Sequence, residues 1–321
     1  MSHISPSTST DSQINLFEQP SKWLYSFWKF SRPHTIIGTT LSVFSLYVIT
    51  LATANSPITL GSIEQFLGAV LACLCGNVYI VGLNQLEDVE IDQINKPHLP
   101  VAAGEFSPRQ AQVIVAVTGI LALLVAGFLG RWLLLMVGTS LAIGTAYSLP
   151  PVRLKRFPFW AALCIFSVRG AIVNLGLFLH FSDRLSGAVS VPPAPVWALT
   201  LFILVFTFAI AIFKDIPDME GDKQYNITTF TIQLGQRAVF NLARWVITIC
   251  YLGMIFAGVF GLSAAVNPVF LGISHWVLLG VLWWRSHRVD LQDKMEIARF
   301  YQFIWKLFFL EYLIFPVACL F

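Results

Sequence analysis

The chain has 321 residues, of which 56% are hydrophobic and only 12% charged, and it includes 27 Phe and 10 Trp. Soluble globular domains carry about 25% charged residues, so this composition excludes an ordinary soluble domain and predicts a lipid-embedded protein. The net charge of +3 says little by itself, because in a membrane protein the positions of the charges are informative, and we expect no nucleic-acid partner.

The N-terminal region differs in composition from the rest of the chain. Its first twenty residues contain Asp11 and Glu18 but no Lys or Arg and no apolar core, which argues against a secretory signal or an Arg-rich transit peptide. We therefore expect residues 1–20 to be a disordered tail and residues 21–321 to form a single transmembrane domain. The aromatic and basic residues between Lys22 and Arg32 are typical of a segment at the membrane interface.

Long apolar windows dominate the remaining sequence. A membrane-spanning helix needs about 20 mostly apolar residues. Windows of this kind cover residues 34–54, 63–86, 110–129, 131–149, 158–181, 195–213, 237–260, 268–284 and 300–320. The third and fourth meet at Gly130 and Arg131, where we expect a turn between two helices. We therefore predict an all-α, polytopic membrane protein with nine transmembrane helices.

The basic residues are distributed unequally between the two sides that these nine spans define. Most Lys and Arg fall on the side of the N-terminus, whereas the loops of the other side carry only Arg131 and Arg184. Because short cytoplasmic loops retain Lys and Arg, we expect a cytoplasmic N-terminus and a C-terminus on the opposite side of the membrane.

Two short acidic segments end the second and sixth spans on the basic side. Both carry polar side chains with a +3, +7 spacing, which at 100° per residue places each set within about 60° of one helix face. The two sets are Gln85, Asp88 and Asp92, preceded by Asn84, and Asp215, Asp218 and Asp222, preceded by Lys214. Helix breakers lie inside the second segment, at Pro217 and Gly221, so we expect it to change from a helix end into a loop.

Two carboxylate faces predict a polyphosphate site. Mg²⁺ prefers oxygen ligands and usually binds through one or two carboxylates together with substrate phosphates. Bound Mg²⁺ would also neutralise the charge that develops on a departing diphosphate. The loop between the fourth and fifth spans adds Arg153, Lys155 and Arg156 on the same side, and we expect at least one of these cations to contact phosphate.

Several other polar residues have two open interpretations. Arg169 lies in the middle of the fifth span, near Asn174, and either links helices or contacts a substrate carboxylate or the diphosphate. His34 and Tyr147 either have packing or interfacial roles or contact a substrate. Glu311 lies deep in the last span, where Arg244 or Arg169 could pair with it.

Specific strings resemble a known family. The paired acidic segments, the loop Tyr147-Ser148-x-Pro-Pro-x-Arg153-x-Lys155-Arg156 and the nine spans resemble the UbiA superfamily of intramembrane prenyltransferases over nearly the whole chain. Shorter strings are similar to cyanobacterial homogentisate prenyltransferases. These are Ser31-Arg32-Pro33-His34-Thr35, Asn84-Gln85-Leu86, Asn95-Lys96-Pro97, Val168-Arg169-Gly170, Asn174-Leu175-Gly176 and residues 214–222. The usual Asn-Asp opening of the first motif is Asn84-Gln85 here, and a neutral Gln contributes no charge to a metal.

The resemblance implies a helical bundle around a central cavity and an Mg²⁺-dependent reaction. A phytyl or related prenyl group would pass from its diphosphate to homogentisate with loss of the carboxyl group, giving 2-methyl-6-phytylbenzoquinol in tocopherol biosynthesis. The implied metal-binding and catalytic residues are Asp88, Asp92, Asp215, Asp218 and Asp222. The implied substrate contacts are Arg32, His34, Asn84, Gln85, Lys96, Tyr147, Arg153, Lys155, Arg156, Arg169, Asn174 and Lys214.

The resemblance also implies a location, and three other functions stay open. The site would face the cytoplasm from a cyanobacterial plasma or thylakoid membrane. A homogentisate solanesyltransferase or a chlorophyll synthase would share the same carboxylate chemistry. A membrane transporter could also contain buried charges, although inverted repeats would not place both acidic segments on one side.

Overall fold

Helices make up nearly all of the regular structure of this protein. The computed structural model describes residues 14–225 and 227–320, and it has no β-strand in these ranges. The helices are α1 (Pro20–Phe30), α2 (Pro33–Ala54), α3 (Leu60–Glu87), α4 (Val89–Asn95), α5 (Pro108–Leu129), α6 (Arg131–Ser148), η2 (Leu154–Arg156), α7 (Pro158–Phe166), η3 (Ser167–Ile172), α8 (Val173–Ser186), α9 (Ala194–Phe213), α10 (Asp215–Gln224), α11 (Phe230–Leu234), α12 (Gln236–Phe260), α13 (Pro268–Ser286) and α14 (Lys294–Leu320).

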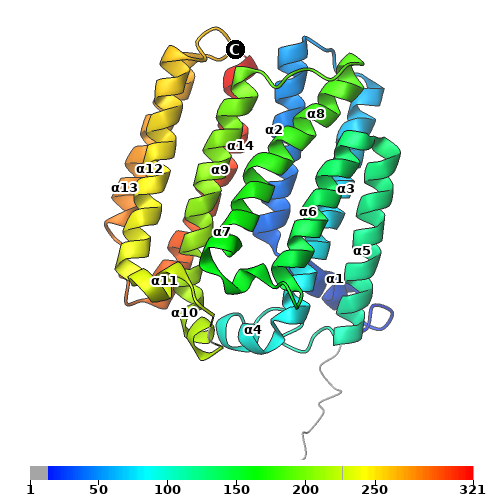
Figure 1. Ribbon diagram of the computed structural model, residues 1–321, viewed down its shortest axis with the longest axis vertical. Helices are drawn as coiled ribbons and strands as arrows, with labels where there is room; N and C mark the ends of the chain where they lie inside the picture. The colour runs from blue at the N-terminus through cyan, green and yellow to red at the C-terminus, as the bar shows by residue number, and fades with distance from the viewer. Residues whose placement is uncertain (1–13, 226, 321) are drawn as a thin grey trace, which may run out of the picture.

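Eight helical segments in the described residues are long and apolar enough to cross a membrane. They are α2, α3, α5, the continuous run α7–η3–α8, α9, α12, α13 and α14. The ninth predicted window forms α6, which lies alongside the others in Figure 1. This 18-residue helix is less apolar because it begins with Arg131 and contains several Ser and Thr residues. The predicted nine spans are therefore close to the eight that qualify by length and composition, and α6 is the difference.

Large apolar side chains cover the outside of the bundle. Ile120, Leu124 and Phe128 on α5 are exposed, as are Ile249, Phe256 and Phe260 on α12 and Ile273 and Trp276 on α13. A surface of this kind is stable against lipid, whereas a soluble monomer rarely exposes apolar patches beyond a few hundred Å². The protein is therefore an integral membrane protein.

The two acidic segments lie at the same end of the bundle, as predicted. Figure 1 shows α1, α4, α10 and α11 gathered at the end opposite the C-terminus. The segment with Arg153 and Lys155 reaches this end as well, because both side chains contact Asp88. Arg184 approaches Gly130, next to Arg131, at the other end.

The N-terminal segment differs in part from the predicted tail. Residues 1–13 of the predicted disordered region lie outside the described residues. Further along, Ile14 N donates a hydrogen bond to Glu105 O at 3.0 Å, and Gln110 Nε2 donates to Ile14 O at 3.1 Å. These contacts join positions about ninety residues apart in the chain, so the local sequence gave no sign of them.

A buried polar pair lies inside the part of the bundle formed by α12, α13 and α14. Glu311 Oε2 lies 3.1 Å from His275 Nε2, and both side chains are fully buried. The predicted pairing of Glu311 with Arg244 or Arg169 is therefore wrong. Arg244 instead donates a hydrogen bond to Asn241 Oδ1 and packs on the Trp283 ring.

Candidate active site

A cavity of about 1170 Å³ extends from the acidic end into the bundle. Most of the residues predicted from the sequence to form the site line this cavity. They are Arg32, His34, Asn84, Asp88, Asp92, Lys96, Tyr147, Lys155, Arg169, Lys214, Asp215, Asp218 and Asp222. Long-range packing thus brings together side chains from α2, α3, α4, α6, η3 and α10.

The first acidic segment is not one helix face. Helix α3 ends at Glu87, Asp88 has non-helical backbone angles (φ −117°, ψ 21°), and α4 begins at Val89. This break keeps Asp88 and Asp92 at the cavity but leaves Gln85 out of it. Gln85 is buried and its Nε2 donates to Phe30 O at 2.8 Å and to Val81 O at 3.3 Å. Gln85 therefore anchors α3 to the end of α1. Its side chain does not line the cavity, where the predicted substrate contact would have placed it.

Cationic and amide groups surround Asp88. Lys155 Nζ lies 2.6 Å from Asp88 Oδ1, and Arg153 Nη2 lies 3.1 Å from the same oxygen. On the other side, Asn84 Nδ2 donates to Asp88 Oδ2 at 2.8 Å. Arg153 adopts a left-handed backbone conformation (φ 38°), which is strained for a non-glycine residue. The loop after α6 is therefore held in an unfavourable conformation that directs two cations to the first acidic segment.

The second acidic segment is a helix rather than a loop. Helix α10 spans Asp215–Gln224 and contains both Pro217 and Gly221. Pro217 lies in the first turn, where a helix makes no use of its N–H group, and this explains why it does not break α10. Asp215, Asp218 and Asp222 all line the cavity, so the predicted common face is present here.

The two acidic segments contact each other across the mouth of the cavity. Lys96 Nζ lies 2.5 Å from Asp218 Oδ2, and Asn95 Oδ1 accepts a hydrogen bond from Gly221 N at 2.9 Å. A Cβ atom at position 221 would overlap the Asn95 side chain. Glycine at this position therefore allows α10 to approach the end of α4.

The carboxyl groups at the mouth are close enough to disfavour one another's ionisation. Burial raises the pKa of Asp222 to about 7, and the neighbouring Asp218 and Asp215 add to the shift. Burial also raises the pKa of Asp92, with a contribution from Asp88 and Asp218 that Arg32 and Lys96 oppose. A bound cation would relieve this repulsion.

The donor set fits Mg²⁺ bound together with substrate oxygens. Asp92 Oδ2 is buried and has no hydrogen-bond partner among the described residues. Within the same residues, no three His, Cys, Asp or Glu side chains converge as an all-protein metal site would require. Mg²⁺ typically takes one or two carboxylates and completes its shell with water and phosphate oxygens. The residues that would hold it are Asp88, Asp92, Asp215, Asp218 and Asp222.

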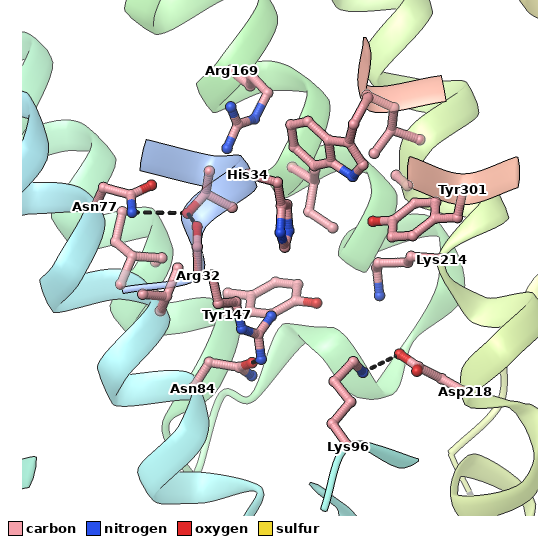
Figure 2. A pocket seen from close by; sticks show the side chains of 18 of the residues that line it. Arg32, His34, Asn77, Asn84, Lys96, Tyr147, Arg169, Lys214, Asp218 and Tyr301 are labelled. Carbon is pink, nitrogen blue, oxygen red and sulfur yellow. Dashed lines mark hydrogen bonds and ion pairs between the residues drawn. The ribbon is translucent and has the colours of Figure 1, made fainter. Parts of the chain in front are cut away.

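Aromatic and cationic side chains line the inner part of the site. Figure 2 shows His34 between Arg169, on the inner side, and Lys96 with Asp218, at the mouth. The His34 ring lies 4.8 Å from the Trp305 ring, between centroids. Trp305, Tyr301 and Asn77 line the cavity but were missed in the sequence. Trp305 and Tyr301 lie on α14, which has many aromatic residues, so its sequence does not single out one face. Asn77 is a lone polar residue inside α3.

Beyond this region the lining becomes mostly apolar, although Ser42 and Ser140 also border the cavity. Ile80 on α3, Leu141 on α6 and Ile165 on α7 border the cavity, which reaches inward as far as Cys73 and Met136. Cys73 precedes Asp88, the residue after the end of α3, by fifteen positions, or about 22 Å along a helix. The cavity therefore combines a charged mouth with a long apolar interior.

Three other predicted residues do not line the cavity, namely Arg153, which contacts Asp88, Arg156 and Asn174. Arg156 is exposed and does not line the cavity. Asn174 is buried behind the wall, where its Nδ2 donates to Gly170 O at 2.8 Å and its Oδ1 accepts from Tyr312 OH at 2.9 Å. The structure thus gives Asn174 the role of joining α8 to α14 instead of contacting a substrate.

Comparison with known proteins identifies the family of the chain. The UbiA prenyltransferase family matches residues 41–307 of the chain. The chain belongs to this family. As a UbiA prenyltransferase it is 58% identical to a homogentisate phytyltransferase of Synechocystis sp. over 92% of this chain and 96% of that protein. It is 41% identical to homogentisate phytyltransferase 1 of Arabidopsis thaliana, over 91% of this chain and 75% of that protein.

The fold of this UbiA prenyltransferase is also known from solved structures. It superposes on a UbiA homolog from Archaeoglobus fulgidus, solved with GPP and Mg²⁺, with a TM-score of 0.61. The superposition covers 91% of this chain and 99% of the other at 16% identity. This similarity concerns the fold alone and confirms the all-helical bundle expected from the sequence.

Proposed function

We propose that this UbiA prenyltransferase transfers a phytyl or related prenyl group from its diphosphate to homogentisate, with loss of the carboxyl group. The product would be 2-methyl-6-phytylbenzoquinol, a tocopherol precursor. The observation that carries the proposal is the charged mouth leading into a long apolar cavity, in a chain 58% identical to a homogentisate phytyltransferase.

The mouth would bind the diphosphate. Lys155, Lys214 and Lys96 present their ammonium groups there, and Asp215 raises the pKa of Lys214 against the opposing effect of burial. Bound Mg²⁺ would supply charge neutralisation for the leaving diphosphate. The five Asp residues would hold the metal, and the cations would contact the phosphate oxygens that the metal leaves free.

The apolar interior would hold the prenyl chain. Its side chains, such as Ile80, Leu141 and Ile165, exclude water from the carbon that becomes electron-deficient as the diphosphate leaves. Aromatic rings near that carbon, including Tyr147 and Trp305, can stabilise a cation by about 0.5–2 kcal/mol each. Exclusion of water also protects the intermediate from hydrolysis.

The proposal includes an orientation and a location. The excess of Lys and Arg at the end that carries α1, α4 and α10 supports a mouth that faces the cytoplasm. We place the enzyme in a cyanobacterial plasma or thylakoid membrane, because its relative at 58% identity comes from Synechocystis. We also treat residues 21–321 as one transmembrane domain.

The purified protein in detergent tests the proposal directly. It would be incubated with Mg²⁺, homogentisate and, in turn, phytyl, geranylgeranyl or solanesyl diphosphate, and product masses would be read. We expect prenylated, decarboxylated product, most of it from phytyl diphosphate, and none in the presence of chelator until Mg²⁺ is restored. Preference for the solanesyl chain, or prenylation of chlorophyllide in place of homogentisate, would replace the proposed substrates. Absence of any prenylated product would reject the proposal.

A further inference from the structure

We propose that His34 is the base that removes the proton from the acceptor ring, in a subsite where Arg169 holds the acceptor's carboxylate. This inference rests on the proposed function and deepens it. It assigns the acceptor a chemical class, an electron-rich aromatic ring with an acidic side chain, and it separates the acceptor subsite from the diphosphate site.

His34 and Arg169 both lie near the indole ring of Trp305 in the inner part of the cavity. The His34 ring centroid lies 4.8 Å from that of Trp305, and Arg169 Cζ lies 5.2 Å from the same ring. Arg169 also approaches the Phe308 ring at 5.8 Å. His34 on α2 and Trp305 on α14 are brought together because these two helices pack against each other. Arg169 belongs to η3, a π-helical turn inside the α7–α8 span. Turns of this kind often mark functional sites.

Both side chains contact aromatic rings but lack hydrogen-bond and ion-pair partners among the described residues. Within residues 14–225 and 227–320, no acidic side chain pairs with Arg169 and no acceptor is hydrogen-bonded to its guanidinium. An unpaired cation at membrane depth is costly and is usually retained for function. The diphosphate has its own cations and carboxylates at the mouth, so the anion that fits Arg169 is the carboxylate of the second substrate.

His34 is placed to act on a ring held by Arg169. In Figure 2 it lies between Arg169 and the mouth, where the prenyl diphosphate would be cleaved. No carboxylate is hydrogen-bonded to the imidazole in the described structure. The charged groups that act on it electrostatically are the cations Arg32, two residues earlier, Arg169 on η3 and Lys96 after α4. Asp218 lies beyond Lys96 at the mouth and is paired with it. A neutral imidazole in this position has a free nitrogen lone pair.

The chemistry balances with these two residues. The bond between the prenyl carbon and the diphosphate oxygen breaks, and its electron pair leaves with the diphosphate. A π pair of the acceptor ring forms the new C–C bond to the prenyl carbon. The C–H bond at that ring carbon then breaks, its electrons restore the aromatic system and its proton moves to the imidazole of His34. Arg169 keeps the ring in place through its carboxylate and exchanges no proton. Loss of the carboxyl group is a separate step, in which the C–C bond to the carboxylate breaks and CO2 leaves. The side-chain carbon keeps that electron pair and takes up one proton, which balances the proton that the ring gave to His34.

His34→Gln tests the base. We expect kcat with homogentisate to fall by about a hundredfold or more, while KM for phytyl diphosphate stays unchanged. Removal of the ring proton becomes slow in this variant, so deuterium at the reacting ring carbon should produce a primary isotope effect on kcat that the wild type lacks. His287→Gln is the matched control, because His287 is exposed at the end of α13 and does not line the cavity. It should behave as wild type.

Arg169→Gln tests the carboxylate contact independently of the base. We expect KM for homogentisate to rise about 10- to 100-fold, the value of a hydrogen-bonded charge. With methylhydroquinone, which has no carboxylate, the variant and the wild type should react at similar rates. Arg237→Gln, at an exposed position of α12 outside the cavity, serves as the control for loss of an arginine.

The outcomes separate the two proposals. A wild-type protein that prenylates nothing overturns the proposed function. A wild type that prenylates homogentisate, with a His34→Gln variant that keeps its kcat and shows no isotope effect, overturns only the assignment of the base. If the Arg169→Gln variant loses activity equally with homogentisate and with methylhydroquinone, the carboxylate contact is overturned. Arg169 would then affect the ring of the acceptor or the fold of the protein.

Discussion

Lys96 and Asp218 form an ion pair, with 2.5 Å between Nζ and Oδ2, that joins the two acidic segments across the mouth of the cavity. The residues are 122 positions apart in the chain, so this contact exists only when the bundle has formed. Asp218 therefore has a protein cation beside it, whereas Asp222 has no ion pair among the described residues. The two carboxylates should respond differently to substitution and to pH.

Replacing Asp218 by Asn should inactivate the enzyme. The substitution keeps the shape of the side chain but removes the charge that pairs with Lys96 and that would also hold Mg²⁺, and we expect kcat/KM to fall by a factor of about 100–1,000. Steady-state rates with varied prenyl diphosphate and fixed Mg²⁺ would measure this.

Glu220→Gln provides the control for this substitution within the same acidic segment. Glu220 is exposed, points away from the cavity and pairs with Lys294. An exposed ion pair contributes only about 0–1 kcal/mol, so activity should stay within about fivefold of the wild type. Equal losses in both variants would mean that the net charge of α10 matters and not the position of Asp218.

Metal binding should depend on pH through Asp222. Its raised pKa of about 7 means that the metal-free folded protein holds a proton there that the unfolded chain releases near pH 4. The folded state is thus stabilised by this group at low pH, and that contribution is lost as pH rises from about 4 through about 7. Above this range the ionised carboxylate is available to Mg²⁺, so metal affinity should increase between pH 6 and pH 8.

Titration of activity with Mg²⁺ at several pH values would measure this effect. The Asp222→Asn variant should bind Mg²⁺ weakly and show little change of affinity over the same range. If the variant keeps the pH dependence of the wild type, another group is responsible for it.

The sequence predicted the architecture well because lipid imposes simple rules. Every one of the nine apolar windows is helical, and the distribution of Lys and Arg placed both acidic segments at one end. Spacing was less reliable at Gln85, because the +3, +7 pattern assumes a continuous helix and the chain breaks at Asp88. Conversely, Pro217 led us to expect a loop, but the segment is helical because a proline can occupy the first turn of α10.

The inner cavity was harder to predict for a physical reason. Trp305 and Tyr301 occur in a helix with many aromatic residues, and only the packing of α14 against α2 determines which of them face the cavity. Asn174 and Glu311 show the same limitation, because their partners, Tyr312 and His275, lie far away in the sequence. Polarity inside a span indicates that a partner exists but does not identify it.

Gly38 should be sensitive to the addition of a single methyl group. A Cβ atom there would lie 3.2 Å from Arg169 Nη1 and 3.3 Å from Phe309 Cε1, so these neighbours must shift by a few tenths of an ångström to admit it. We expect Gly38→Ala to displace the guanidinium and raise KM for homogentisate while leaving KM for the prenyl diphosphate unchanged.

Gly253→Ala is the matched control for this substitution. A Cβ atom at Gly253 would meet nothing within 4 Å, and Ala is favoured over Gly in a helix by about 1 kcal/mol. This variant should be active and at least as stable as the wild type. Unchanged kinetics in Gly38→Ala would show that Phe309 moves instead, and that Arg169 keeps its position.

The buried pair of His275 and Glu311 should contribute to stability and not to catalysis. Neither residue lines the cavity, and both are completely buried between α13 and α14. Removing one partner leaves a buried polar group unsatisfied, which typically costs about 1–3 kcal/mol, whereas replacing both partners with apolar residues is often neutral or stabilising. Glu311→Leu alone should therefore lower the thermal unfolding midpoint measured in detergent, and the double variant Glu311→Leu/His275→Phe should recover it. Activity per folded molecule should stay near wild type in both. A double variant that is less stable than the single one would show that the pair itself, and not the cost of leaving one member unpaired, holds α13 against α14.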